Sequence, residues 1–302
     1  MINNGKIIVF AFAGRKKYLE IQRHYISSLL HSHANMEYHL WNFSRNASDN
    51  EYLQELASSS PQIRIFNQFY DGDNNVTVCS KAVGVICACV KCRVGRWTEP
   101  YKYYANDPEY SDAKFVKIDD DIVFLETRAF EAFVNAIGLR KNLILSANVI
   151  NNGVCAALDP RQTEILKGLQ LLPASIPAYW SLCTRVEFMV AAHEYFFRQR
   201  SALLDQAHLF TMIPRSRFSI NTIGFDWDVM CQIAEKLRGE ASMNDEHLIS
   251  ANFDIAVMQG FVTCHLHFAD QRASLTDAAE DEILSRYDGE RVRYLESSTL
   301  ET

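Results

Sequence analysis

The chain has 302 residues, of which 48% are hydrophobic and 22% are charged, and its formal net charge is -7. Such a composition can bury a large core, which excludes a disordered chain. The negative charge argues against broad electrostatic binding of nucleic acid or of an anionic membrane. A small polar or uncharged ligand fits this chain better.

Strand and helix patterns alternate along the first 70 residues. Apolar runs at 6–13, 37–43 and 64–69 predict strands, and the apolar spacing within 16–30 and 49–58 predicts helices. This order is typical of an α/β domain with a mostly parallel central sheet flanked by helices.

The rest of the chain is less regular. The predicted elements are helices at 78–94, 127–138 and 226–237 and from 245 onward, and strands at 114–124, 142–150 and 261–268. In the helix at 127–138, Thr127 is the expected N-cap and Gly138 the expected stop. After residue 271 the chain turns polar and charged, which predicts a peripheral helix and a frayed end.

Cysteine content and the first apolar run bear on the compartment. The eight cysteines are too few for a disulfide scaffold in a chain this long. Four lie between 79 and 92, but without the paired Cys-x2-Cys spacing of structural zinc sites, so reduced thiols are expected over zinc. The apolar run at 7–13 is shorter than the roughly 20 residues that span a bilayer. Basic residues at 15–17 favour folded protein over a cleaved secretory leader, so we expect a cytoplasmic protein without a membrane span.

Three consecutive acids, Asp119, Asp120 and Asp121, interrupt the predicted strand at 114–124. Side chains alternate across a strand, so Asp119 and Asp121 are expected on one side and Asp120 on the other. Like charges this close repel unless a cation lies between them, and carboxylates select Mg²⁺ or Mn²⁺. Ligands of α/β sheets bind beyond the carboxyl ends of strands. A solvated turn is the alternative, but the apolar residues at 122–124 argue against it.

With these residues in place, the chain resembles glycosyltransferases of the GT-A type. The segments that carry the resemblance are FAGR (12–15), WNFSRN (41–46), KIDDDIVF (117–124), SANVINNG (146–153), NDEHLIS (244–250) and CHLHF (264–268). The resemblance implies a Rossmann-like GT-A fold with a smaller acceptor-side part. It divides the chain into a nucleotide-sugar-binding half (1–154), an acceptor-binding and catalytic half (155–270) and a peripheral tail (271–302).

The resemblance also implies a metal site and a general base. Asp119 and Asp121 would hold Mn²⁺ or Mg²⁺, and His265 would complete the site, with His267 next in line and a buried core histidine as the alternative. Inverting members use a carboxylate at a helix start as the base on the acceptor hydroxyl. Here Asp245 or Glu246 would serve, although acids at that position are also ordinary capping residues.

Donor contacts follow from the same resemblance. The expected donor-binding residues are Phe12, Ala13, Arg15, Asn42, Arg45, Asp119 and Asp120, with Lys81 as a further phosphate contact. An ordinary surface position is the alternative interpretation for Arg15, Asn42 and Arg45. The aromatic side chains of Tyr179, Trp180 and Trp227 either stack on a sugar or fill the core.

The implied activity is sugar transfer from a nucleoside diphosphate sugar, with UDP favoured, to a hydroxyl acceptor. The acceptor is open between a glycan, a lipid-linked sugar, a natural product and a modified nucleobase, and nucleic acid enters only as an acceptor. The alternative enzyme is a sugar-nucleotide nucleotidyltransferase, which would need a glycine-rich phosphate loop where AGRKK (13–17) has one glycine. The alternative without turnover is a nucleotide- or metal-binding module.

Overall fold

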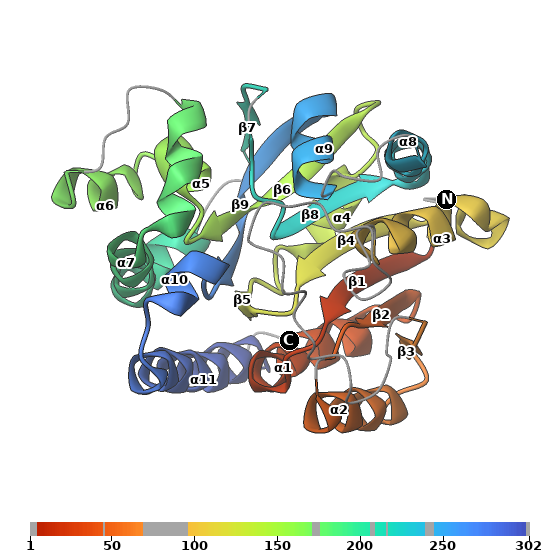
Figure 1. The fold of residues 1–302 in the computed structure, drawn as a ribbon, viewed down its shortest axis with the longest axis horizontal. Helices are drawn as coiled ribbons and strands as arrows, with labels where there is room; N and C mark the ends of the chain where they lie inside the picture. Colours follow the sequence, from red (N-terminus) through yellow and green to blue (C-terminus); the bar gives the residue numbers. More distant parts are fainter. Residues whose placement is uncertain are drawn as a thin grey trace, which may run out of the picture.

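The computed structural model describes residues 5–44, 46–68, 96–170, 176–205, 209–215, 217–238 and 245–299. A mixed β-sheet runs through the molecule with helices on both sides (Figure 1). The predicted α/β class, with a central sheet flanked by helices, is confirmed. No helix in these ranges is long and apolar enough to cross a membrane.

The N-terminal part follows the predicted alternation. Its elements are β1 (Ile7–Ala13), α1 (Lys16–Ser32), β2 (Met36–Asn42), α2 (Ala47–Ser58) and β3 (Ile63–Phe66). The three strands are parallel. β2 lies between β3 and β1, and β1 also pairs with β4, which joins them to the rest of the sheet. These elements match their predictions because each buries a locally encoded apolar face.

The remaining strands are β4 (Lys114–Asp119), β5 (Ile122–Leu125), β6 (Leu143–Ile150), β7 (Phe210–Ile213), β8 (Thr222–Asp226) and β9 (Asp254–His265). The strand order is β3-β2-β1-β4-β8-β6-β9-β5, with β7 also paired to β9. The sheet is parallel from β3 to β4, as predicted. Beyond β4 it is mixed, because β8 runs antiparallel to both β4 and β6.

The prediction of one strand over 114–124 is wrong. The chain leaves β4 at Asp119, turns, and re-enters the sheet as β5 against β9. Asp120 stabilises the turn, because its carboxylate accepts hydrogen bonds from the loop after β1. The last strand also differs from its prediction: β9 begins at Asp254 and ends at His265.

The other α-helices are α3 (Glu99–Asn106), α4 (Phe130–Ala136), α5 (Gly153–Leu158), α6 (Thr163–Gly168), α7 (Val186–Leu204), α8 (Trp227–Arg238), α9 (Asp245–Asn252), α10 (Ala269–Ala273) and α11 (Asp277–Thr299). The described residues also form 3₁₀ segments: η2 (Arg96–Thr98), η3 (Pro108–Tyr110) and η4 (Ile176–Thr184). The helix predicted at 78–94, and the four cysteines between 79 and 92, lie outside the described residues.

Helix α4 begins later than predicted. Its N-cap is Ala129, so the assignment of that role to Thr127 is wrong. The Thr127 backbone N–H instead donates to the Tyr294 hydroxyl at 3.0 Å, a partner 167 residues away in the sequence. The predicted stop is supported, since Gly138 follows the helix with a φ of +81°, a conformation that favours glycine.

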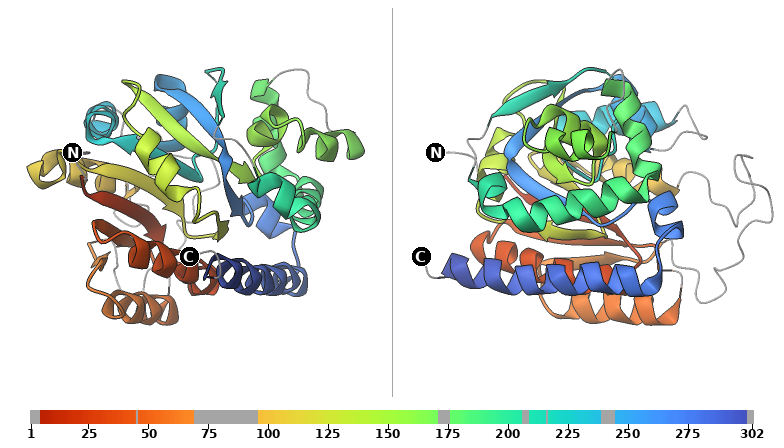
Figure 2. Two further views of the ribbon diagram at one scale, coloured as in Figure 1. Left: turned by 180° about the vertical axis from the view of Figure 1, so that it is seen from behind. Right: turned by 90° about the vertical axis from the view of Figure 1, so that its left-hand side faces the viewer.

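Helix α11 packs firmly against the body of the protein. It lies along α1 in both views of Figure 2 and contacts β5. Fully buried Phe124 of β5 joins the helices, with its ring 5.4 Å from Tyr25 of α1, 4.8 Å from Phe196 of α7 and 5.1 Å from Tyr294 of α11. The segment after residue 271 therefore contributes to the core as well as to the surface.

Candidate functional site

A polar cavity of about 340 Å³ opens at the carboxyl ends of β1 and β4. Predicted site residues that line it are Phe12, Arg15, Asp119, Asp120, Asp121, Asp245, Glu246, His265 and His267. They come from segments that are far apart in the sequence. The cavity is therefore the candidate active site.

Asp120 attaches the acidic turn to the loop after β1. Its carboxylate accepts hydrogen bonds from the Gly14 backbone N–H at 3.0 Å and from Arg15 Nε at 3.0 Å. The Arg15 guanidinium also lies 3.0 Å from Oδ2 of Asp121. Arg15 thus bridges two neighbouring acids and offsets part of their repulsion.

The loop that carries Arg15 requires a glycine at position 14. A Cβ atom there would lie 2.6 Å from the carbonyl oxygen of Phe43 and 2.9 Å from its carbon, both backbone atoms. Only a glycine lets the loop approach the end of β2 this closely.

We expect Gly14→Ala to lower the free energy of unfolding by about 1–3 kcal/mol, because the added methyl group must displace backbone. Urea titration measures this. Gly168→Ala is the matched control, since no atom lies within 4 Å of the Cβ that it would add. Equal stability of Gly14→Ala and the parent protein would show that the loop has room to relax.

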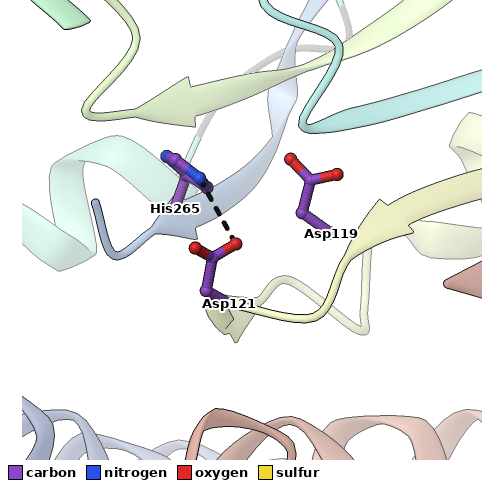
Figure 3. Close-up of side chains that lie close together, drawn as sticks. All are labelled: Asp119, Asp121 and His265. Carbon is purple, nitrogen blue, oxygen red and sulfur yellow. Dashed lines mark ion pairs between the residues drawn. The ribbon is translucent and has the colours of Figure 1, made fainter. Parts of the chain in front are cut away.

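Asp119, Asp121 and His265 converge at one point of the cavity. Their ligand atoms lie within 4.8 Å of one another, and Figure 3 shows the three side chains directed toward a common space. His265 Nε2 is 3.3 Å from Asp121 Oδ1. The strand pairing explains the approach, since β5 and β9 are antiparallel and place Ile122 opposite His265.

Two buried atoms of these side chains have no hydrogen-bond partner within the described part of the chain. They are Oδ1 of Asp121, which has only the ion-pair contact with His265 Nε2 at 3.3 Å, and Nδ1 of His265. Burial opposes ionisation of Asp121, but Arg15 and the nearby imidazoles hold its pKa well below its usual range, so its carboxylate is charged. A charged, buried carboxylate oxygen without a hydrogen-bond donor, beside an imidazole and a second carboxylate, fits a divalent cation such as Mn²⁺ or Mg²⁺.

Lys117 and Asn221 hold Asp119 in place. Lys117 Nζ lies 2.6 Å from Oδ1 of Asp119, and Asn221 Nδ2 donates to Oδ2 at 3.0 Å. Burial lowers the pKa of Lys117, but Asp119 and Asp245 bring it above its ordinary value, so the side chain is an ammonium. Each Asp119 oxygen keeps a lone pair for a cation. The sequence offered one signal for Lys117, a charge in an apolar strand two residues before Asp119, and none for Asn221.

Asp245 and Glu246 open α9 on another wall of the cavity. Asp245 Oδ2 accepts from the Tyr101 hydroxyl at 2.9 Å, and its Oδ1 accepts from the Glu246 backbone N–H at 3.0 Å. Glu246 Oε1 accepts from Trp180 Nε1 and Arg217 Nε, each at 3.3 Å. Burial raises the pKa of both carboxyl groups.

An aromatic wall borders the cavity beside the end of β2. The rings of Phe43 and Trp97 stack at 4.8 Å with an interplanar angle of 5°, and Phe12 meets both edge-on. Trp97 is 42% exposed, so a ligand can reach this wall. Phe43 and Trp97 were missed as site residues, because an isolated aromatic residue in a sequence more often signals core.

Several predicted residues do not line the cavity. Asn42 is fully buried; its amide donates at 2.8 Å to Asn50 and to Asn67, and its Oδ1 accepts from the Ser44 backbone N–H. Ala13 is buried too, and its carbonyl accepts from the Phe43 N–H at 2.7 Å.

The three aromatic residues considered for sugar stacking lie in different surroundings. Trp180 reaches the site through Glu246, and Tyr179 is partly buried beside Gly153. Trp227 donates to the Tyr104 carbonyl at 3.3 Å, away from the cavity lining. Arg45 and Lys81 lie outside the described residues.

Comparisons with known proteins find only remote structural similarity. No protein-family model matches the chain, and no curated protein matches it. A 4-diphosphocytidyl-2C-methyl-D-erythritol synthase from Anaerococcus prevotii aligns over 94% of this chain and 97% of its own, with 12% identity and a TM-score of 0.44. The galactosyltransferase LgtC, with donor and acceptor sugar analogues, aligns over 83% of this chain and 72% of its own, at 8% identity and a TM-score of 0.38. The bifunctional glycosyltransferase WbbM aligns over 94% of this chain and 44% of its own, at 15% identity and a TM-score of 0.36. Similarity this low says nothing of function.

Proposed function

We propose that the chain is a metal-dependent glycosyltransferase that moves a sugar from a nucleoside diphosphate sugar, with UDP favoured, to a hydroxyl acceptor. One observation carries the proposal: ligand atoms of Asp119, Asp121 and His265 converge within 4.8 Å in a polar cavity, and the buried Asp121 oxygen among them accepts no hydrogen bond from the described residues. Groups of this kind suit a cation that is shared with a diphosphate. The aromatic wall beside the cavity suits a nucleobase.

The proposed metal ligands are Asp119, Asp121 and His265. The ion, when bound, supplies Lewis acidity toward the departing diphosphate. Arg15 pairs with Oδ2 of Asp121, which would leave Oδ1 for the ion. Lys117 pairs with Asp119 and would supply a fixed positive charge on the cavity wall toward a bound diphosphate.

Phe12, Arg15 and Asp120 are proposed to border the donor, since all three line the cavity. Ala13 and Asn42 are proposed to support that surface from within the protein, because both are buried beside it. In this arrangement residues 1–154 bind the donor and 155–270 bind the acceptor.

Glu246 is the proposed general base on the acceptor hydroxyl, with Asp245 as the second candidate. Both lie on the cavity wall, and burial moves the pKa of each toward the working range of a base. Both Asp245 oxygens already accept hydrogen bonds that hold the start of α9, which favours Glu246. A base acting opposite the leaving diphosphate gives inversion at the sugar carbon.

The test is calorimetry of UDP binding with and without Mn²⁺, followed by an assay of UDP-sugar hydrolysis. We expect UDP to bind only with the metal, and the UDP-sugar to hydrolyse slowly without an acceptor. Failure of UDP and other nucleoside diphosphates to bind with Mn²⁺ would refute the proposal. Release of pyrophosphate from a nucleoside triphosphate and a sugar phosphate would identify a nucleotidyltransferase instead, and binding without any turnover would identify a binding module.

A further inference from the structure

The carboxylate proposed as the general base is held by one of its two oxygens. Glu246 Oε1 accepts hydrogen bonds from Trp180 Nε1 and from Arg217 Nε, each at 3.3 Å. No hydrogen bond from the described part of the chain reaches its Oε2. Because a carboxylate is one planar group, fixing Oε1 also fixes the direction in which Oε2 presents its lone pairs.

The two donors also contact each other. The guanidinium carbon of Arg217 lies 3.6 Å from the centre of the Trp180 ring, which is a cation–π contact. A guanidinium can stack with its flat face and donate from its edge at the same time, whereas the ammonium of a lysine cannot. Each donor is therefore held by the other as well as by Glu246.

Arg217 begins a short segment that also reaches the proposed metal site. The residues that follow it are buried. The Ile220 carbonyl accepts from Lys117 Nζ at 3.0 Å, and Asn221 Nδ2 donates to Asp119 Oδ2 at 3.0 Å. A single segment thus holds groups on both walls of the cavity, the one with the proposed base and the one with the proposed metal ligands.

We propose that Arg217 and Trp180 are positioning residues for sugar transfer, which direct Oε2 of Glu246 at the acceptor hydroxyl. This inference rests on the proposed function, because it concerns the same base. In the transfer, Oε2 takes the proton of the hydroxyl while the hydroxyl oxygen bonds to the anomeric carbon. The bond from that carbon to the diphosphate breaks, and its electron pair leaves with the nucleoside diphosphate. The competing explanation is an ordinary surface ion pair, since the side chains of Arg217 and Glu246 are 42% and 22% exposed.

The charges around Glu246 give the pH dependence a definite sign. Burial raises the pKa of Glu246, and the cation of Arg217 opposes that rise. Asp245 raises this pKa and Lys117 lowers it, whereas the Cys183 thiol, with its own pKa raised to about 11, is neutral. Removal of the Arg217 charge therefore raises the pKa of Glu246 further. Since a base must be ionised, the acidic limb of kcat moves to higher pH.

Hydrolysis of UDP-glucose with Mn²⁺, with water as the acceptor, tests the inference; if the parent protein hydrolyses another UDP-sugar faster, that sugar is used. We expect Arg217→Gln to lower kcat by about 10- to 100-fold, as for a misplaced catalytic group, and to leave KM unchanged. Arg217→Lys should keep the parent's acidic limb, because its charge remains, but should still lose kcat. Trp180→Phe should lower kcat as well, since it keeps the ring but removes the donor.

Arg215→Gln is the matched control. Arg215 lies two residues earlier and donates from the same atom, Nε, to Oδ1 of Asp254 at 3.2 Å, but it is 66% exposed and does not line the cavity. This substitution should change kcat by less than about twofold, as expected for an exposed ion pair.

A double variant separates a positioning role from an independent one. A residue that acts only through Glu246 causes no further loss once Glu246 is replaced, so Arg217→Gln should change the residual kcat of Glu246→Gln by less than about twofold. Circular dichroism verifies that each variant is folded. An unchanged kcat and acidic limb in Arg217→Gln, or its full loss repeated in the double variant, would overturn the inference and leave the proposed function standing. If the parent protein neither binds UDP with Mn²⁺ nor hydrolyses a UDP-sugar, the proposed function fails, and the inference fails with it.

Discussion

Asp121→Asn is expected to weaken Mn²⁺ binding by more than about 100-fold, since even outer partners of a metal ligand account for about 10–100-fold. The substitution keeps the size of the side chain but removes its charge, which Arg15 and the nearby imidazoles stabilise in the parent protein. Sugar transfer should fall to background. Calorimetry with Mn²⁺, with and without UDP, measures the loss.

Stability provides the internal check on this variant. Arg15 still pairs with Asp120 when Asp121 is neutral, but the charge of Asp121, whose pKa the fold holds low, no longer contributes to stability, so the metal-free variant should fold and unfold somewhat earlier than the parent. Asp112→Asn is the matched control, because Asp112 is exposed and precedes the opposite end of β4. Full Mn²⁺ affinity in Asp121→Asn would remove the basis of the proposed function.

Glu246→Gln is expected to lower kcat by about 100- to 10,000-fold, the usual contribution of a general base. Binding of Mn²⁺ and of UDP should stay unchanged, because Glu246 acts on the acceptor side. Steady-state kinetics with a nucleotide sugar and an accepted hydroxyl compound measures the effect. Glu235→Gln, an exposed position in α8, is the control.

The pH dependence of kcat tests the same role. A base must be ionised, and burial raises the pKa of Glu246 above its ordinary value of 4.5. Activity should therefore fall as the pH drops through a value above 4.5, and this acidic limb should vanish from the residual activity of Glu246→Gln. If Asp245→Asn instead produces the larger loss, the base is Asp245. If neither variant affects kcat, the mechanism has no base on this wall.

Features that depend only on residues close together in the sequence could be predicted from it. The parallel strands β1 to β3 and their helices appear where the apolar pattern predicts them, because each element is encoded by its own periodicity. The same reasoning failed at 114–124, where apolar residues on both sides of the three acids suggested one strand but a turn separates two. That turn is stabilised by hydrogen bonds between Asp120 and the loop at Gly14 and Arg15, more than 100 residues earlier.

The candidate site likewise contains some residues that the sequence predicted and others that it did not. Asp119, Asp121 and His265 were predicted as a group, and the structure brings their ligand atoms within 4.8 Å, but through a turn and an antiparallel strand pair and not through alternation along one strand. Asn221, which also lines the cavity, gave no signal, because an amide in an irregular segment resembles an ordinary surface residue.

By itself, the sequence determined the α/β class, the parallel first half of the sheet and the acidic residues around which a cation site can form, since apolar periodicity and charge spacing are local properties. The tertiary structure decided which groups share the cavity and which buried atoms lack partners. Those features depend on contacts such as His267 with Glu280 and Lys117 with Asp119, whose energies arise only when the folded chain removes the side chains from water.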